Sequence, residues 1–387
     1  MKSNNEEKEK PEAKLKERAL EFHIGGKLRV NSKVEINKDT ISLAYTPGVA
    51  MPCIEIAKNK EDVYKYTSKG NMVAVITDGS AVLGLGDIGP EASLPVMEGK
   101  SLLFKHFADI DAFPIALKTK DVDEIVNTIK LISPMFGGVN LEDISAPRCF
   151  EIEERLKREL DIPVFHDDQH GTAIVVCAAL INASKVVDKK ISDLKIVING
   201  AGAAGTATAK LLLKLGVKDL ILLDSVGIIS KDRSDLNKYK KEIAEVTNND
   251  GKKGDLKNAM KSADVFIGLS KAGLVSKEMV RTMNNDPIII AMANPVPEIM
   301  PDEAKEAGAK CVGTGRSDFP NQINNVLAFP GVFRGVLDER KKQITDDMKL
   351  NAAKAIASLV KNPSYDCFIP SVFDKKIVEK VAEAVKR

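Results

Sequence analysis

This sequence of 387 residues lacks the features typical of membrane, secreted and nucleic-acid-binding proteins. No apolar run approaches the ~20 residues that a membrane-spanning helix needs, so we expect no contact with a membrane. The 57 basic and 55 acidic side chains leave a net charge of only +2, which argues against nucleic acid as a partner held by net positive charge. The charged start, residues 1–16, has no apolar core and is therefore not a secretory signal; we expect it to form the frayed beginning of a helix.

Cysteine is scarce and widely spaced, with five residues in the chain and no CxxC pair. This pattern provides neither a disulfide framework nor the usual ligands of a zinc site. It is typical of proteins in a reducing compartment, so we predict a cytoplasmic location.

The composition that remains is that of a globular protein, with 44% hydrophobic and 29% charged residues. Apolar runs rich in β-branched residues alternate with segments of helical period, which indicates an α/β fold. The expected strands are Met72–Thr77, Phe113–Lys118, Pro163–His166, Lys195–Asn199, Leu220–Leu223, Val265–Leu269 and Pro287–Ala293. The expected helices are Val122–Ile132, Phe150–Leu160, Gly171–Val187, Ala204–Leu215, Asp346–Lys361 and Lys376–Lys386.

The clearest change of composition is the charged stretch Val186–Lys195, which precedes a new strand and a glycine-rich turn. A length of 387 residues suggests about two or three domains. We expect residues 1–162 to form one α/β domain. We expect residues 163–387 to form a doubly wound dinucleotide-binding domain of Rossmann type with C-terminal helices.

The glycine-rich turn contains Gly200, Gly202 and Gly205, which match G-x-G-x-x-G between an apolar strand and a helix rich in Ala and Leu. The first glycine permits a tight turn, the second lets the backbone approach a pyrophosphate, and the third allows close packing of helix on strand. Ala203 and Ala204 stand where the helix begins and free N–H groups face an anion. The segment predicts a dinucleotide site.

Asp224 ends the next strand, close to the ~20-residue offset of a ribose-binding carboxylate. A carboxylate accepts hydrogen bonds from the ribose 2′-hydroxyl and repels a 2′-phosphate, which favours NAD over NADP. One alternative is a turn or helix-capping role for Asp224. Another is that Lys231 and Arg233, a few residues further on, neutralise a phosphate and permit both cofactors.

Two acidic pairs stand where strands are expected to end, Glu142-Asp143 and Asp167-Asp168. Adjacent carboxylates repel one another unless a cation separates them. Oxygen ligands without cysteine favour Mg²⁺ or Mn²⁺ over zinc. Solvated turns are the alternative interpretation of both pairs.

Lys100 interrupts an apolar helix-like stretch, and burial there is expected to lower its pKa toward that of a general base. The alternative is a surface lysine whose stem lies along apolar neighbours. Tyr45 precedes a Thr-Pro-Gly turn, where the alternative is a phenol that only anchors the loop.

Taken together, these segments resemble the malic enzymes, and specifically their short, prokaryotic-type class. The stretches that carry the resemblance run in the same order over most of the chain: Ser42–Ala50, Thr77–Gly89, Pro95–Phe104, Gly138–Pro147, Phe165–Ala173, Asn199–Gly205, Ala291–Glu298 and Gly313–Leu327. The resemblance implies metal-dependent oxidative decarboxylation of (S)-malate to pyruvate and CO₂ with reduction of NAD(P). It also implies that the first domain is catalytic and that the protein is a homodimer.

The resemblance further implies a role for each matching residue. Tyr45 is the general acid, Lys100 the general base, and Asp167 assists beside the metal. The implied metal ligands are Glu142, Asp143 and Asp168, and the residues implied to contact malate and the nicotinamide end of the cofactor are Asn294 and Asn325.

One departure from the family concerns the substrate carboxylate. Larger members carry an arginine that binds it, but here Ala81 follows Thr77-Asp78-Gly79-Ser80. We expect Ser80, the backbone of this turn or a residue elsewhere to replace that arginine.

Two other functions use the same glycine turn. One is a 2-hydroxy acid dehydrogenase that does not decarboxylate, which needs no metal site. The other is an NAD(H)-binding regulatory protein, which tolerates loss of Lys100.

Overall fold

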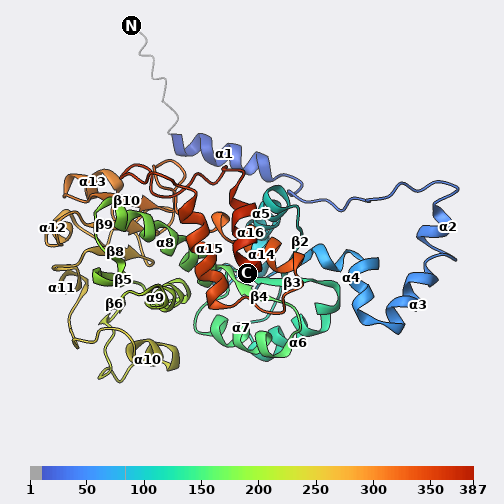
Figure 1. The fold of residues 1–387 in the computed structure, drawn as a ribbon, viewed down its shortest axis with the longest axis horizontal. Helices are drawn as coiled ribbons and strands as arrows, with labels where there is room; N and C mark the ends of the chain where they lie inside the picture. Colours follow the sequence, from blue (N-terminus) through green and yellow to red (C-terminus); the bar gives the residue numbers. More distant parts are fainter. Residues whose placement is uncertain (1–10, 83) are drawn as a thin grey trace, which may run out of the picture.

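Two largely parallel sheets organise the chain (Figure 1), which confirms the predicted α/β class. The computed structural model describes residues 11–82 and 84–387, so most of the charged start lies outside the described residues. The first sheet has four strands in the order β2-β1-β3-β4, and the second has six in the order β10-β9-β8-β5-β6-β7. Among the helices of the described ranges, none is long and apolar enough to cross a membrane.

The first sheet is parallel throughout and is covered by helices on both faces (Figure 1). Its strands are β1 (Met72–Thr77), β2 (Asp111–Ala116), β3 (Gly138–Leu141) and β4 (Val164–His166). Alternate residues of β1 face opposite cores: Ala74 and Ile76 share a core with α6 (Val122–Ile132) and α7 (Arg148–Glu159). The first sheet extends to the end of β4, four residues beyond the predicted domain boundary at residue 162.

The second sheet is parallel except for β7, which is antiparallel to β6. Its strands are β5 (Lys195–Asn199), β6 (Asp219–Asp224), β7 (Gly227–Ile228), β8 (Val265–Gly268), β9 (Ile288–Ala291) and β10 (Cys311–Thr314). Helices on one face include α8 (Asp167–Val186), α9 (Ala203–Leu215) and α15 (Asp346–Ser358). Those on the other are α11 (Leu256–Met260), α12 (Lys277–Arg281) and α13 (Pro301–Glu306). This is the doubly wound arrangement expected for a dinucleotide-binding domain.

The remaining elements flank these layers. The helices are α1 (Pro11–His23), α2 (Ile41–Ala44), α3 (Ala50–Lys58), α4 (Val63–Tyr66), α5 (Pro90–Ala108), α10 (Lys238–Ala244), α14 (Phe329–Asp338) and α16 (Ile377–Lys386). Short 3-10 helices are η1 (Lys60–Asp62), η2 (Ser68–Asn71), η3 (Ser133–Met135), η4 (Ile191–Asp193) and η5 (Asn325–Leu327).

One buried core joins the two sheets. Val73 and Val75 of the first sheet belong to the same apolar cluster as Ile196 and Ile198 of the second. Helix α8 begins directly after β4 and is buried along most of its length, where it packs against α9 and α15. The helix therefore connects the end of the first sheet rigidly to the dinucleotide-binding layer.

The segment around α2 and α3 differs from the rest, because it stands away from both sheets (Figure 1). No residue of Ile41–Ala44 or Ala50–Lys58 is buried. Large apolar side chains are nevertheless frequent along it, and those exposed are Val30, Val34, Ile36, Ile41, Leu43, Tyr45, Met51 and Ile54. We call residues 30–58 the arm.

Candidate active site

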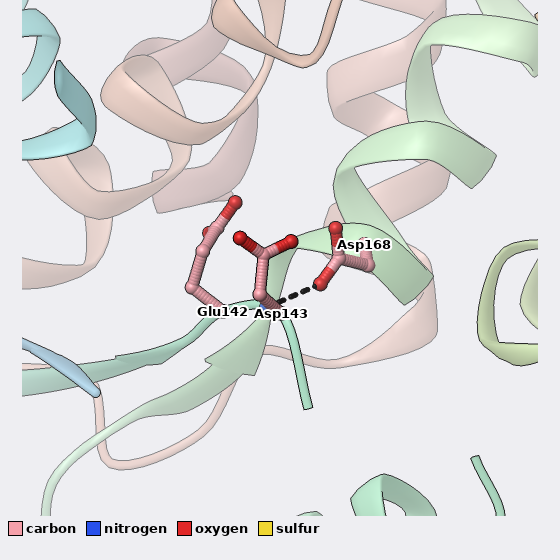
Figure 2. A group of neighbouring side chains, drawn as sticks. All are labelled: Glu142, Asp143 and Asp168. Atoms are coloured by element: carbon pink, nitrogen blue, oxygen red, sulfur yellow. Dashed lines mark hydrogen bonds between the residues drawn. The ribbon is translucent and has the colours of Figure 1, made fainter. Parts of the chain in front are cut away.

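Three carboxylates from the two acidic pairs meet at one edge of the first sheet. Glu142 and Asp143 follow β3, while Asp168 lies in the first turn of α8, directly after β4. Because β3 and β4 are neighbouring parallel strands, their carboxyl ends lie side by side. Figure 2 shows the three side chains converging, and one oxygen of each lies within 4.8 Å of the others.

Asp143 has the most unusual surroundings of the three. Its backbone φ is 53°, in the left-handed region that non-glycine residues rarely adopt. Its N–H donates to Asp168 Oδ2 at 2.8 Å (Figure 2). Both of its own carboxylate oxygens are buried and have no hydrogen-bond partner among residues 11–82 and 84–387. Buried carboxylate oxygens without a donor, on a residue with a strained backbone, are suited to bind a cation.

The electrostatics of the cluster also favour a cation. Burial raises the pKa of the Glu142, Asp143 and Asp168 carboxyl groups, and neighbouring carboxylates raise each of them further. A divalent ion bound by these oxygens would offset both effects. An oxygen-only donor set suits Mg²⁺ or Mn²⁺, so the residues present fit the predicted metal.

Lys100, on α5, lies within this cluster. Its Nζ is 2.5 Å from Asp167 Oδ2 and 2.9 Å from Glu142 Oε1, and it lies over the Phe329 ring. Burial alone lowers the pKa of Lys100, but Asp167 and Glu142 raise it more, so the pKa lies above its ordinary value. The predicted lowering is wrong for the metal-free protein, because two carboxylates contact the ammonium directly.

The two asparagines occupy different parts of the site. Asn325 donates to Asp167 Oδ2 at 3.1 Å and accepts from the Thr172 hydroxyl at 3.2 Å, so it contacts the acidic cluster directly. Asn294 follows β9 and is half-buried. The backbone carbonyl of Asn294 lies against the turn that follows β1, since a Cβ built at Gly84 would be 2.8 Å from that oxygen.

Arg148, a residue that the sequence analysis did not single out, stabilises the turn after β1 together with Ser80. The Ser80 hydroxyl donates to Asp78 Oδ1 at 2.5 Å and accepts from Ser145 N–H and Arg148 Nη2, both at 2.9 Å. Arg148 also forms an ion pair with Asp78. The Ser80 hydroxyl is therefore committed within the protein. The available signal was an arginine five residues after Asp143, but no spacing rule links it to the turn.

Tyr45 is not brought to this cluster by its own chain. It follows α2 in the arm, and 72% of it is exposed. Lys100 is nearly buried on α5, and Figure 1 shows α2 standing apart from that helix. The predicted acid and base are therefore separated within one chain.

The glycine-rich turn borders a cavity of about 670 Å³, which is also lined by Pro147 and Phe150 at the start of α7. Gly200 has a φ of +120°, a conformation that strains any other residue. A Cβ at Gly205 would lie 1.7 Å from the Gly200 carbonyl oxygen, so only glycine fits there. Ala203 and Ala204 begin α9, whose N-terminus faces this turn.

Asp224 lines the same cavity, but its carboxylate already has partners. Arg233 binds both oxygens, at 2.8 and 3.0 Å, and Lys240 Nζ is 2.6 Å from Oδ2. Burial raises the pKa of Asp224, yet these hydrogen bonds outweigh it and hold the pKa well below its ordinary range. Lys231 instead pairs with Glu245 at 3.2 Å. Two cations therefore stand beside the predicted ribose-binding residue.

Comparisons with known proteins agree with this geometry. Residues 26–157 match the family described as malic enzyme, N-terminal domain, and residues 169–387 match malic enzyme, NAD binding domain. The chain is 61% identical over 379 residues to the bifunctional malic/malolactic enzyme of Bacillus subtilis (strain 168), covering 96% of this chain and 92% of that protein. It is 56% identical over 376 residues to the NAD-dependent malic enzyme of Geobacillus stearothermophilus, covering 96% and 78%.

Solved structures give the same result. The crystal structure of an NAD-dependent malic enzyme from Thermotoga maritima has a TM-score of 0.92 and 51% identity, with 95% of this chain and 98% of that chain covered. Other relatives are named NADP-dependent malic enzymes. The resemblance predicted from the sequence is confirmed over nearly the whole length. The chain belongs to the malic enzyme family.

Proposed function

We propose that this chain catalyses the divalent-metal-dependent oxidative decarboxylation of (S)-malate to pyruvate and CO₂, with reduction of NAD or NADP. The observation that carries the proposal is the convergence of three carboxylates, two of them buried and Asp168 partly exposed, with the Lys100–Asp167 pair. A glycine-rich dinucleotide cleft borders the same domain junction.

In this proposal, Glu142, Asp143 and Asp168 hold Mg²⁺ or Mn²⁺. When bound, the cation supplies Lewis-acid stabilisation of the negative charge that develops on the C2 oxygen of malate. Lys100 and Asp167 together act as the base toward the C2 hydroxyl. The open acceptor of this pair is Asp167 Oδ1, which is buried and has no donor within the described ranges.

The remaining contacts fix the reactants in place. Asn325, bonded to Asp167, orients malate against the base. We assign Asn294 to the nicotinamide end of the cofactor because it matches the family's asparagine at this position. The Ser80 hydroxyl and Ser80 N–H both bond Asp78, and the Ala81 N–H bonds the Asp143 carbonyl. We therefore assign the second malate carboxylate to a residue outside this turn.

The test of this function is an assay of malate with NAD and with NADP, in the presence and absence of Mn²⁺, that follows pyruvate and reduced cofactor together. Equal amounts of both products, strictly dependent on metal, support the proposal. Oxaloacetate without a metal requirement would identify a non-decarboxylating dehydrogenase. Tight NADH binding without turnover would identify a regulatory protein.

We further propose that the active form is a homodimer in which the arm packs on a second copy of the chain and supplies Tyr45 to its partner's cluster. Support comes from the row of exposed apolar side chains along the arm, which a second copy would bury. Exchange of an identical segment between protomers is a common route to dimers. In this arrangement Tyr45 protonates C3 after CO₂ leaves.

Mixed dimers test this arrangement directly. Tyr45→Phe and Lys100→Ala are each expected to be inactive alone. In a heterodimer of the two, isolated with different tags, one site contains both an intact Lys100 and an intact Tyr45 only if the tyrosine comes from the partner. Recovery of about half the wild-type activity per active dimer supports exchange of the arm. No recovery would place Tyr45 in its own chain's site.

For the cofactor, we propose a preference for NAD with NADP also accepted. We assign Asp224, which lines the cavity at the glycine turn, to the ribose, and this favours NAD. Arg233 and Lys240 beside it offset the repulsion of a 2′-phosphate. A cytoplasmic location is proposed on the five cysteines, all of which are free thiols.

A further inference from the structure

The strand that leads to the metal site contains one polar residue. β3 lies between β1 and β4 and all four of its residues are buried. A strand covered on both faces in a parallel sheet is normally an unbroken apolar run. Asn140 interrupts it, fully buried and in register with Val75 on one side and Phe165 on the other.

Packing does not account for this asparagine. Its Oδ1 is buried and has no hydrogen-bond donor anywhere in residues 11–82 and 84–387. An unsatisfied buried amide oxygen destabilises the fold, and an apolar side chain of similar volume would avoid that cost. The residue therefore has to act through its other polar atom.

That atom contacts a proposed metal ligand. Asn140 Nδ2 donates to Glu142 Oε2 at 2.9 Å. Side chains two residues apart on an extended chain point to the same face, which is why the amide reaches the carboxylate. The other oxygen, Oε1, accepts from Lys100 at 2.9 Å. Glu142 is thus held at both oxygens, by a neutral donor on one side and by the proposed base on the other.

We propose that Asn140 is a positioning residue that fixes the orientation of Glu142 for the divalent cation. The inference rests on the metal site of the proposed function. Holding one carboxylate oxygen in place removes rotational freedom that Glu142 would otherwise lose when it binds the ion. Partners that orient metal ligands typically contribute ~10–100-fold in metal affinity.

The test is Asn140→Leu, which removes the donor and fills the same space with apolar atoms. Mn²⁺ binding is measured on the metal-free protein without malate, from the electron paramagnetic resonance signal of free Mn²⁺. We expect Mn²⁺ to bind ~10–100-fold more weakly. In EDTA the melting temperature should fall less than that of Asn182→Leu, because the loss of the donor to Glu142 Oε2 is offset by removal of the orphaned amide oxygen. The Mn²⁺ concentration for half-maximal activity should rise more than kcat at saturating Mn²⁺ falls.

Asn182→Leu is the matched control. Asn182 is also fully buried, but its amide bonds the Ala357 and Phe368 carbonyls, remote from the cluster in the fold. It should lower the melting temperature and leave Mn²⁺ affinity unchanged. Asn140→Ala, which also removes the donor, replaces the leucine variant if that variant does not fold. Mn²⁺ affinity within threefold of the wild type, or a loss of stability in EDTA like that of Asn182→Leu, overturns the proposal. Absence of Mn²⁺ binding by the wild type overturns the metal site itself.

Discussion

The acidic cluster and the dinucleotide cleft both lie at the carboxyl ends of parallel strands, yet they present opposite kinds of polar group. The cluster places buried side-chain carboxylates together, some with no hydrogen-bond partner in the described part of the chain. The cleft offers backbone N–H groups at a glycine turn and the start of a helix. A cluster of like charges is strained until a cation arrives, whereas backbone donors are ready without one. A substitution in the acidic cluster should therefore leave NADH binding unchanged, and one in the cleft should leave Mn²⁺ binding unchanged.

The largest expected effect comes from removing a proposed metal ligand, which should stop turnover but leave the dinucleotide cleft intact. Asp168→Asn keeps the shape of the side chain and an acceptor for the Asp143 N–H, but removes a charged ligand. We expect turnover to be abolished while NADH binding, measured by fluorescence, is unchanged. Asp161→Asn, at an exposed site three residues before β4 begins at Val164, is the surface control. Full activity of Asp168→Asn at saturating Mn²⁺ would remove Asp168 from the site.

The converse experiment breaks the cleft. Gly205→Val places a side chain where even a Cβ lies 1.7 Å from the Gly200 carbonyl oxygen, so the turn must open. We expect NADH binding and activity to be lost while the metal-free protein still binds Mn²⁺. Loss of Mn²⁺ binding in this variant would show that the two halves are coupled through the shared core.

A change at the base should affect the chemical step more than binding. Lys100→Ala is expected to lower kcat by ~10²–10⁴-fold with a smaller change in the KM for malate, the usual effect of removing a general base. Lys105→Ala is the control, since Lys105 lies on the same helix but pairs only with surface-accessible Asp109 and Asp111 among the described residues. A rise in KM alone would make Lys100 a substrate-binding charge.

The pH dependence of stability should reveal the acidic cluster, because it holds buried like charges and the dinucleotide cleft does not. Burial raises the folded-state pKa of the cluster carboxyls, to about 8 for Glu142 and about 9 for Asp143, so between pH 7 and pH 9 they hold more protons in the native metal-free protein than in the unfolded chain. Below that range the buried His166 and His170, whose pKa values burial lowers, act in the opposite direction. Stability must then fall as pH rises from 7 to 9. Melting temperatures in EDTA should therefore decrease over this interval, and Mn²⁺ should remove the decrease. An equal slope with and without Mn²⁺ would contradict this prediction.

The smallest expected effect concerns cofactor choice within the cleft. Asp224→Ala removes the carboxylate that binds Arg233 and Lys240, leaving both cations free to meet a 2′-phosphate. We expect the ratio of kcat/KM for NAD to that for NADP to fall about fivefold, the factor that ~1 kcal/mol for a partly exposed ion pair corresponds to. Lys231→Ala, whose partner is Glu245, should leave the ratio unchanged. A wild-type preference for NADP would show that the cations outweigh Asp224.

Elements with a strong local pattern were predicted closely. The strand Lys195–Asn199 and the helix Val122–Ile132 have the bounds expected from their apolar periodicity. β3 and β10 were not predicted, because each is four residues long and contains glycine, and β3 is also interrupted by Asn140. Helix α8 begins four residues earlier than expected, since the acidic pair forms its first turn rather than a loop.

The sequence alone determined the fold class, the family and the glycine turn, because each depends on residues that are contiguous or on motifs in a fixed order. Only the tertiary structure decided that Lys100 meets Asp167 and Glu142, which raises its pKa instead of lowering it. It also decided that Asp224 is paired with two cations and that Tyr45 lies on an exposed arm. The physical reason is that charge energies depend on the distance between side chains, and that distance is set by which strands become neighbours in the sheet.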